Sequence, residues 1–291
     1  MTILAACSGG DKAQPNLQAL LISGQVNQYH NMETMDRTVV RYLEETGLFD
    51  VTHLATPAAG ADMSGFAPDF AGYDVVILNY DGAAWPEQTA TAFEAYMRDG
   101  GGLVSVHSSD NSFAAWPAFL EMTAVGGWNG RNEDFGPAIR WGDDGVELFH
   151  GPGEAFHPPP HDFVVTIRDK THPVTKGLPD QWLHADDELY SSLRGPAKNV
   201  TVLATGFADP NVEHASGFHE PVLMAIDYGE GRVFHTTLGH IAAEETEAPE
   251  SVRCTGFATT LQRGAEWAAT GTVTQALPDN LPGPATTRLY D

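Results

Sequence analysis

Short apolar runs of strand length recur along the first 110 residues of the chain. They lie at residues 17–24, 75–78 and 103–106, and a more polar run lies at 49–54. Runs this short that are apolar throughout are typical of strands buried on both faces of a parallel sheet. We therefore expect Phe49–Leu54 to form an edge strand and the other three to lie inside the sheet.

Two segments with helical spacing separate these runs. In the first, Met35, Val39 and Leu43 share one face, Thr34 is the expected N-cap, and Gly47 ends the segment. The second begins near Pro86 and ends at the triple glycine 100–102. Strands alternating with helices predict an α/β, flavodoxin-like, doubly wound fold with a mainly parallel sheet and helices on both faces.

The pattern loosens from Phe113 to about Asp162, where tryptophans are scattered among many glycines. A long Gly/Trp-rich insertion of this kind is usually functional or carries short strands of its own. Beyond it, residues 162–168 and 200–204 have the alternation of strands, and 221–238 predict a β-hairpin around Tyr-Gly-Glu-Gly. A final helix is expected from Ser251 to Gly271.

We expect one domain over residues 17–274 and a surface tail at 275–291. Residues 1–16 differ, because Leu4-Ala5-Ala6-Cys7-Ser8 resembles the bacterial lipobox and a polar tether follows it. No basic region precedes the cysteine, and only six residues stand where an apolar stretch belongs. Two interpretations stay open: an exported, periplasmic or outer-membrane lipoprotein anchored at Cys7, or a chance match in a cytoplasmic protein.

Composition narrows the possible partners. The chain is 42% hydrophobic and 19% charged, which is typical of a globular protein, and it carries 39 acidic against 15 basic residues, a net charge of −24. Such a surface repels phosphate backbones, so a small neutral or cationic molecule is expected rather than nucleic acid. Alternatively, the acidic surface serves to keep the protein soluble and does not indicate the kind of ligand. Cys254 is expected to be a small buried hydrophobe, and nothing predicts a disulfide framework or an oligomeric state.

The stretch Gly100–Asn111 combines a glycine turn, a buried strand and a polar cluster where the strand stops. Ligands of open α/β sheets bind beyond the carboxyl ends of the strands, so His107, Ser108 and Asn111 are candidate site residues. The alternative is that these polar residues only cap the next helix.

Three of the twelve histidines follow expected strands, namely His30, His107 and His240. Because strand ends gather at one edge of a sheet, these rings can converge. Asp187 and Glu188 form a second candidate group, since apolar neighbours can raise the pKa of a carboxyl toward acid–base usefulness. The alternative interpretation is that these acids belong to a solvent-exposed turn and have no role in a site. The cluster around His219 and Glu220 precedes the hairpin and is expected to be a lid or a plain loop.

Spacing alone does not indicate a metal centre. His150, His157 and His161 are separated by glycines and prolines that exclude a shared helix, and no HExxH motif is present. No cofactor is required by the motifs, although a divalent metal held by distant residues stays possible. The GxSxG, GxGxxG and P-loop motifs are also absent. Ser108 or Ser109 could still act as a nucleophile beside a histidine, but we expect them to orient a ligand or cap the helix.

Several longer motifs nevertheless occur in a recognisable order. In sequence these are Tyr73–Val76, Gly100–His107 with Asn111 and Trp116, Gly126–Trp128, His172–Pro179, Asp187–Tyr190, Glu220–Val222, Gly229–His235 and Leu238–His240. With these motifs the chain resembles the ThuA-like (trehalose utilisation) family, a branch of the class I glutamine amidotransferase-like superfamily.

The resemblance implies a flavodoxin-like fold and an enzyme acting on a 3-keto-disaccharide or a related glycoside. The superfamily's amidotransferases carry a cysteine nucleophile where this chain has His107, which argues against glutamine hydrolysis. His107 or Glu188 would remove the proton beside the ketone, and His30 or His240 would protonate an oxygen. Isomerisation and glycosidic cleavage share this step and stay open. Expected substrate-binding residues are Ser108, Asn111, Trp128, Tyr190, His219 and Glu220.

Two alternatives from other classes remain. One is a non-catalytic sugar-binding or scaffold protein with a degenerate pocket, and the other is a metal-dependent hydrolase.

Overall fold

The structure is a computed structural model that describes residues 16–290. The lipobox-like sequence at Cys7 lies outside the described residues. None of the helices between residues 16 and 290 is long and apolar enough to cross a membrane.

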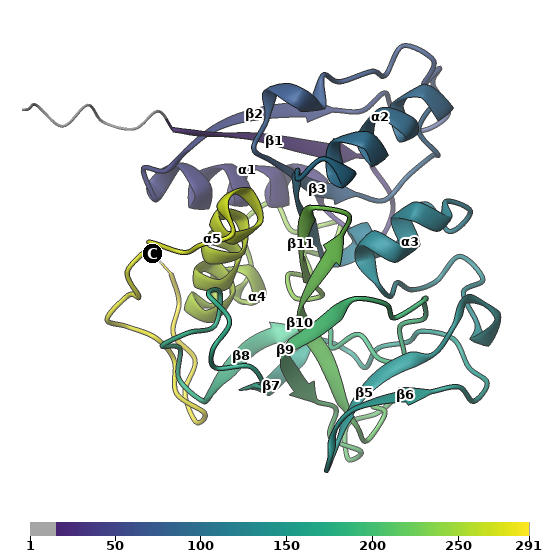
Figure 1. The fold of residues 1–291 in the computed structure, drawn as a ribbon. Helices are drawn as coiled ribbons and strands as arrows, with labels where there is room; N and C mark the ends of the chain where they lie inside the picture. Colours follow the sequence, from purple (N-terminus) through teal and green to yellow (C-terminus); the bar gives the residue numbers. More distant parts are fainter. Residues whose placement is uncertain (1–15, 291) are drawn as a thin grey trace, which may run out of the picture.

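One mixed sheet of eleven strands runs through the described chain (Figure 1). Its main path follows the order β2-β1-β3-β4-β11-β10-β9-β7-β8, and the β5–β6 hairpin attaches beside β10. The strands are β1 (Leu17–Gly24), β2 (Phe49–Ala55), β3 (Val75–Tyr80), β4 (Gly102–Val106), β5 (Ala138–Gly142), β6 (Gly145–Phe149), β7 (His161–Ile167), β8 (Gln181–Asp187), β9 (Val200–Phe207), β10 (His219–Tyr228) and β11 (Gly231–Thr236).

The sheet has a parallel half and an antiparallel half. The pairs β1–β2, β1–β3, β3–β4 and β4–β11 are parallel. All pairs from β11 through β10, β9 and β7 to β8 are antiparallel, as is β5–β6. The expectation of a mainly parallel sheet is therefore wrong. The chain returns by a tight hairpin at Tyr228–Gly231 instead of by a crossover helix, and a hairpin can join only antiparallel strands.

Helices cover both faces of the parallel half. They are α1 (Met32–Glu45), α2 (Glu87–Arg98), α3 (Pro117–Thr123), α4 (Glu250–Arg253) and α5 (Thr255–Thr270), with short 3₁₀ turns η1 (Phe70–Gly72), η2 (His107–Asn111) and η3 (Glu133–Phe135). Figure 1 shows α1 and α5 on one side of β3 and β11, and α2 and α3 on the other. Successive strand residues belong to two separate cores, as with Leu21 toward α1 and Leu20 toward the opposite layer. This two-sided burial explains why the strands are apolar throughout.

The helix ends differ in detail from the sequence-based expectation. Asn31, not Thr34, caps α1, because its side-chain oxygen accepts from the Thr34 amide at 3.0 Å, and Thr34 lies buried inside the first turn. The late helix is two helices, with buried Cys254 between them. Gly271 ends α5 in a left-handed conformation, as expected.

The long insertion holds α3, η3 and the β5–β6 hairpin. β8 was not expected, since its final residues read as an acidic turn. The tail returns to the domain: the Tyr290 amide donates to the Arg253 carbonyl at 2.6 Å, and the Leu183 amide donates to the Gly283 carbonyl at 2.8 Å.

Candidate functional site

A pocket of about 660 Å³ opens beyond the carboxyl ends of β1, β3 and β4. Its wall carries imidazole, carboxyl, amide and aromatic side chains, from Gln28, Tyr29, His30, Asp81, Asn111, Trp128, Asn129, His157, Glu188, Tyr190 and His240. Two other hollows of similar volume, lined by residues between 64 and 101 together with Ala269, contain no histidine. The chemistry of the described residues therefore gathers in the first pocket.

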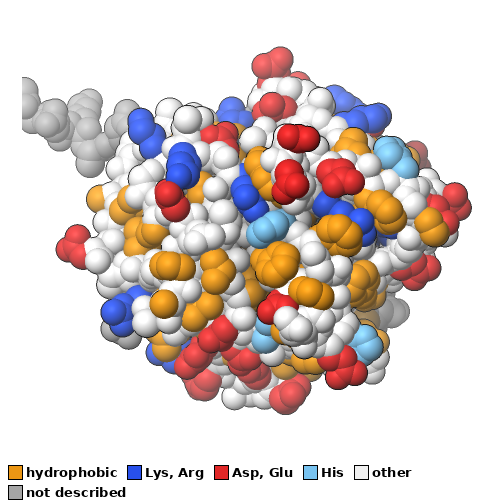
Figure 2. All heavy atoms as spheres, turned by 90° about the horizontal axis from the view of Figure 1, so that it is seen from below, with side chains coloured by type: hydrophobic (Ala, Val, Ile, Leu, Met, Phe, Trp, Pro, Cys, Tyr) orange, Lys and Arg blue, Asp and Glu red, His pale blue; other side chains and the backbone are white. Residues whose placement is uncertain are grey.

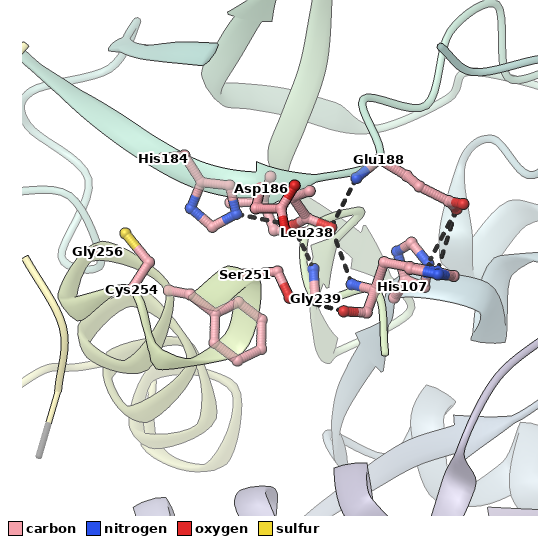
Figure 3. Close-up of polar contacts among 12 residues, drawn as sticks. His107, His184, Asp186, Glu188, Leu238, Gly239, Ser251, Cys254 and Gly256 are labelled. Carbon is pink, nitrogen blue, oxygen red and sulfur yellow. Dashed lines mark hydrogen bonds and ion pairs between the residues drawn. The ribbon is translucent and has the colours of Figure 1, made fainter. Parts of the chain in front are cut away.

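Three histidines and one glutamate converge at this pocket. Ligand-type atoms of His30, His107, Glu188 and His240 all lie within 4.8 Å of one another. His240 Nδ1 lies 3.2 Å from Glu188 Oε2 and 3.3 Å from His107 Nε2. His107 Nε2 lies 3.7 Å from the same Glu188 oxygen. Figure 3 shows the Glu188 carboxyl directed at these ring nitrogens. The convergence expected from strand ends is present.

The backbone presents His107 to this cluster. It follows β4 directly and has a left-handed φ of 44°, which turns the chain sharply at the strand end. Its Nδ1 donates to the Thr237 carbonyl at 2.7 Å, which leaves Nε2 as the nitrogen facing the cluster. The Tyr190 hydroxyl lies 2.9 Å from this Nε2 and donates to it. His107 is only 3% exposed, so it supports the floor of the pocket from below.

Asp187 lies behind the cluster and holds it in place. Its two oxygens accept from the backbone amides of Glu188, Gly239 and His240 at 2.8–2.9 Å, and from His184 Nε2 at 2.7 Å (Figure 3). Burial alone would raise the pKa of Asp187, but His184 beside it holds that pKa below its usual value. Conversely, Cys254 and Asp187 outweigh burial and raise the pKa of His184 to about 10. Asp187 is fully buried with both oxygens occupied, which fits a positioning residue.

Burial sets the protonation of the cluster. It lowers the pKa of His30 to about 3, and it lowers the pKa values of His107 and His240, with neighbouring imidazoles adding to the effect at His30 and His107. Burial, with the charge of Asp187, raises the pKa of Glu188 to about 8. Without a bound ligand, the cluster at neutral pH therefore consists of three uncharged imidazole rings and a mostly protonated Glu188 carboxyl.

Five pocket residues were missed from the sequence, and two of them, Asp81 and His157, carry a carboxyl or imidazole group. Burial, with the nearby charge of Asp110, raises the pKa of Asp81 to about 6. It follows β3 directly, so the strand-end rule that selected His107 could have found it. His157 Nδ1 lies 3.6 Å from Glu188 Oε1, but it stands before three prolines in an irregular segment, and no sequence signal marks it.

Three of the expected substrate-binding residues line the pocket, namely Asn111, Trp128 and Tyr190. The ring of Trp128 lies 4.5 Å from that of Tyr190, centroid to centroid. Ser108 is buried beneath the pocket, beside a small void that His30 and His107 also line.

His219 and Glu220 are not brought to the pocket. Glu220 is buried and accepts from the Ser192 amide at 3.1 Å, while His219 pairs across the sheet with Trp141 and Phe207. They begin strand β10, so the expected lid or loop is a strand end.

The arrangement supports two kinds of chemistry. Carboxyl and imidazole groups in one pocket can transfer protons to and from a bound molecule. Three imidazoles and a carboxylate within 4.8 Å are also a donor set that could hold a transition-metal cation.

Comparisons with known proteins agree with this picture. A family model described as "Trehalose utilisation" (ThuA) matches residues 18–268. A crystal structure of a ThuA-like protein from Parabacteroides merdae is 44% identical, with a TM-score of 0.91 over 95% of this chain and 98% of that one. A ThuA-like protein from Bacteroides uniformis is 18% identical, with a TM-score of 0.57 over 92% and 97% of the two chains, and shares the fold. No curated protein matches the chain.

Proposed function

The chain belongs to the ThuA family of trehalose utilisation, and on that premise we propose that it is an enzyme that removes a proton beside the carbonyl of a 3-keto-glycoside. One observation carries the proposal: three histidines and two carboxyl groups share a single aromatic-lined pocket of about 660 Å³.

Asp81 is the proposed base. Its carboxyl lines the pocket and accepts no hydrogen bond from residues 16–290. Its pKa of about 6 leaves it mostly ionised at neutral pH and still basic enough to accept a proton. A carbonyl makes the hydrogen on the adjacent carbon acidic, so a carboxylate of this kind can take it.

The cluster of His30, His107, Glu188 and His240 is proposed to receive the carbonyl oxygen. When Asp81 takes the proton, the electron pair of the C–H bond becomes part of a carbon–carbon double bond and the carbonyl oxygen gains negative charge. Glu188, whose pKa of about 8 keeps its carboxyl protonated at neutral pH, can donate to that oxygen. A donor already in place lowers the barrier, because it needs little rearrangement as the charge develops.

Two outcomes follow from the same enolate. Return of the proton to the former carbonyl carbon isomerises the sugar, as the hydroxyl on the deprotonated carbon passes its hydrogen to the former carbonyl oxygen and becomes the new carbonyl. Loss of the glycosidic oxygen from the carbon next to the deprotonated one cleaves the glycoside, with the leaving oxygen taking a proton. Tyr29, Trp128 and Tyr190 offer aromatic faces on which a sugar ring can pack.

The test is exchange and turnover with purified protein. Trehalose and its 3-keto form are incubated in D₂O, and deuterium uptake beside the ketone is followed by NMR. We expect uptake from the keto form only. Asp81→Asn should slow it by about 10²–10⁴-fold, the usual contribution of a positioned base.

Asp144→Asn is the matched control, because Asp144 lies exposed in the β5–β6 turn. Unchanged exchange in Asp81→Asn would remove Asp81 from the mechanism. A keto-sugar that binds with neither exchange nor cleavage would show a sugar-binding protein instead.

A further inference from the structure

We propose that His30, His107, Glu188 and His240 form a binding site for one divalent transition-metal cation. The binding itself is measured without any sugar, whereas the role of the cation in catalysis rests on the proposed function.

The spacing of the donor atoms matches a coordination polyhedron. Around a tetrahedral zinc ion with bonds of about 2.0–2.1 Å, neighbouring ligand atoms lie about 3.3 Å apart. His240 Nδ1, His107 Nε2 and Glu188 Oε2 form a triangle with sides of 3.2, 3.3 and 3.7 Å. His30 completes the set within 4.8 Å.

The ring of His107 is oriented as that of a metal-binding histidine is. Such a ring usually donates its second N–H to a carbonyl or carboxylate, which fixes the nitrogen that faces the metal. His107 does this through Nδ1 to the Thr237 carbonyl. His240 is held from behind, since its amide donates to Asp187 and its carbonyl accepts from Ser251 Oγ at 2.7 Å.

His30 adds an independent observation. Its Nδ1 is buried and has no hydrogen-bond partner among the described residues. Leaving such a buried atom unpaired is unfavourable, so a ring placed here without a partner points to a ligand. The Tyr190 hydroxyl, which donates to His107 Nε2 in the cluster without metal, would turn its hydrogen away when a cation binds.

The donor set selects the cation. Three imidazole nitrogens and one carboxylate suit zinc, iron, cobalt or nickel, whereas magnesium and calcium require oxygen ligands. A cation here would polarise the carbonyl oxygen of a bound keto-sugar. Asp81 is outside the donor set and stays available as a base.

The experiment uses untagged protein stripped with EDTA and titrated with Zn²⁺ by calorimetry, and with Co²⁺ followed by visible absorption. We expect one equivalent of Zn²⁺ per chain and the absorption of Co²⁺ bound to nitrogen. Glu188→Gln and His240→Ala should each weaken Zn²⁺ binding by at least about 100-fold, since loss of even an outer partner costs 10–100-fold.

His214→Ala is the control, because His214 is exposed on the surface, where its Nε2 lies 3.4 Å from Glu213 Oε1. Saturating Zn²⁺ should also raise the Tm of the wild type and of His214→Ala, but not of Glu188→Gln. Absence of stoichiometric Zn²⁺ binding by the wild type would overturn the proposal, as would equal binding by wild type, Glu188→Gln and His240→Ala.

The two proposals fail separately. If protein stripped with EDTA binds no Zn²⁺ but still exchanges hydrogen for deuterium in the keto-sugar, the metal-site proposal is wrong and the proposed reaction stands. If Zn²⁺ binds tightly and the variants weaken this binding, but no keto-sugar shows exchange, the proposed reaction is wrong and the metal site stands.

Discussion

The buried carboxyl of Asp81 makes a testable link between stability and function. Its pKa of about 6 in the fold lies above the ordinary value of 3.8. The folded chain therefore keeps a proton that the unfolded chain has lost between about pH 4 and pH 6, and the free energy of unfolding falls as pH rises through that window. A group that destabilises the fold when charged is typical of functional sites.

Asp81→Asn should accordingly be more stable than wild type by about 1–3 kcal/mol at neutral pH, and the difference should fade toward pH 4. No described hydrogen bond to this side chain is lost on substitution. Urea unfolding at several pH values measures the effect. A variant less stable than wild type at neutral pH would contradict the assigned cause.

Asp187 predicts the opposite behaviour. Asp187→Asn removes the charge that faces buried His184 and puts an amide nitrogen where an oxygen accepts. We expect a loss of about 3–5 kcal/mol, as when one partner of a buried ion pair is removed. The neighbouring Asp186→Asn is the control, since Asp186 is exposed. Equal urea midpoints for the two variants would show that Asp187 does not hold the cluster.

At the scale of elements, close approach of α5 to the sheet depends on a glycine. A methyl group on Gly264 would overlap the ring of Phe234 in β11. Alanine favours a helix by about 1 kcal/mol over glycine, but overpacking costs about 1–3 kcal/mol.

We therefore expect Gly264→Ala to lower the Tm. Gly65→Ala, where nothing lies within 4 Å of an added methyl, should leave it nearly unchanged. A higher Tm for Gly264→Ala would mean that helix propensity outweighs packing at this contact.

The elements also show what sequence patterns can predict. Strands β1, β3 and β4 were found because both faces are buried, which makes them apolar throughout. β8 was missed because it ends in acids. Asp187 is paired with His184 in the same strand, and the amides of Gly239 and His240, which are distant in sequence, donate to it. The β10–β11 hairpin was predicted from its turn residues, whereas the antiparallel pairing of β9 with β10 and with β7 follows no local pattern.

The same limit applies to the site. His30, His107 and His240 were predicted because strand ends gather at one edge, and Glu188 because apolar neighbours flank its acidic group. Asp81 was overlooked although it directly follows β3, where the strand-end rule applies, and His157 was missed because a histidine before prolines has no local signal. The closeness of the four donor atoms to one another is visible only in three dimensions.

For the whole molecule, charge is the dominant global property. The net charge of −24 lies mostly on acids without basic partners, and Figure 2 shows acidic side chains spread among hydrophobic ones on one face. Like charges oppose the compact state, and salt screens them over about 10 Å at 0.1 M.

We expect the Tm at neutral pH to rise by several degrees between about 0.01 and 0.5 M NaCl, because screening weakens self-repulsion. Melting curves near the isoelectric point of about 4.6 are the internal control, since the net charge there is close to zero and the salt effect should largely disappear. A Tm at neutral pH that stays constant or falls with salt would contradict this account.

The position of β11 between β4 and β10 has a consequence for synthesis of the chain on the ribosome. Domains emerge from the N-terminus first, so β4 is made long before the strand that pairs with its open edge. Until β11 arrives, that edge can pair with a neighbouring nascent chain. His240 follows β11, so the nascent protein has an incomplete site until nearly all of it has been translated.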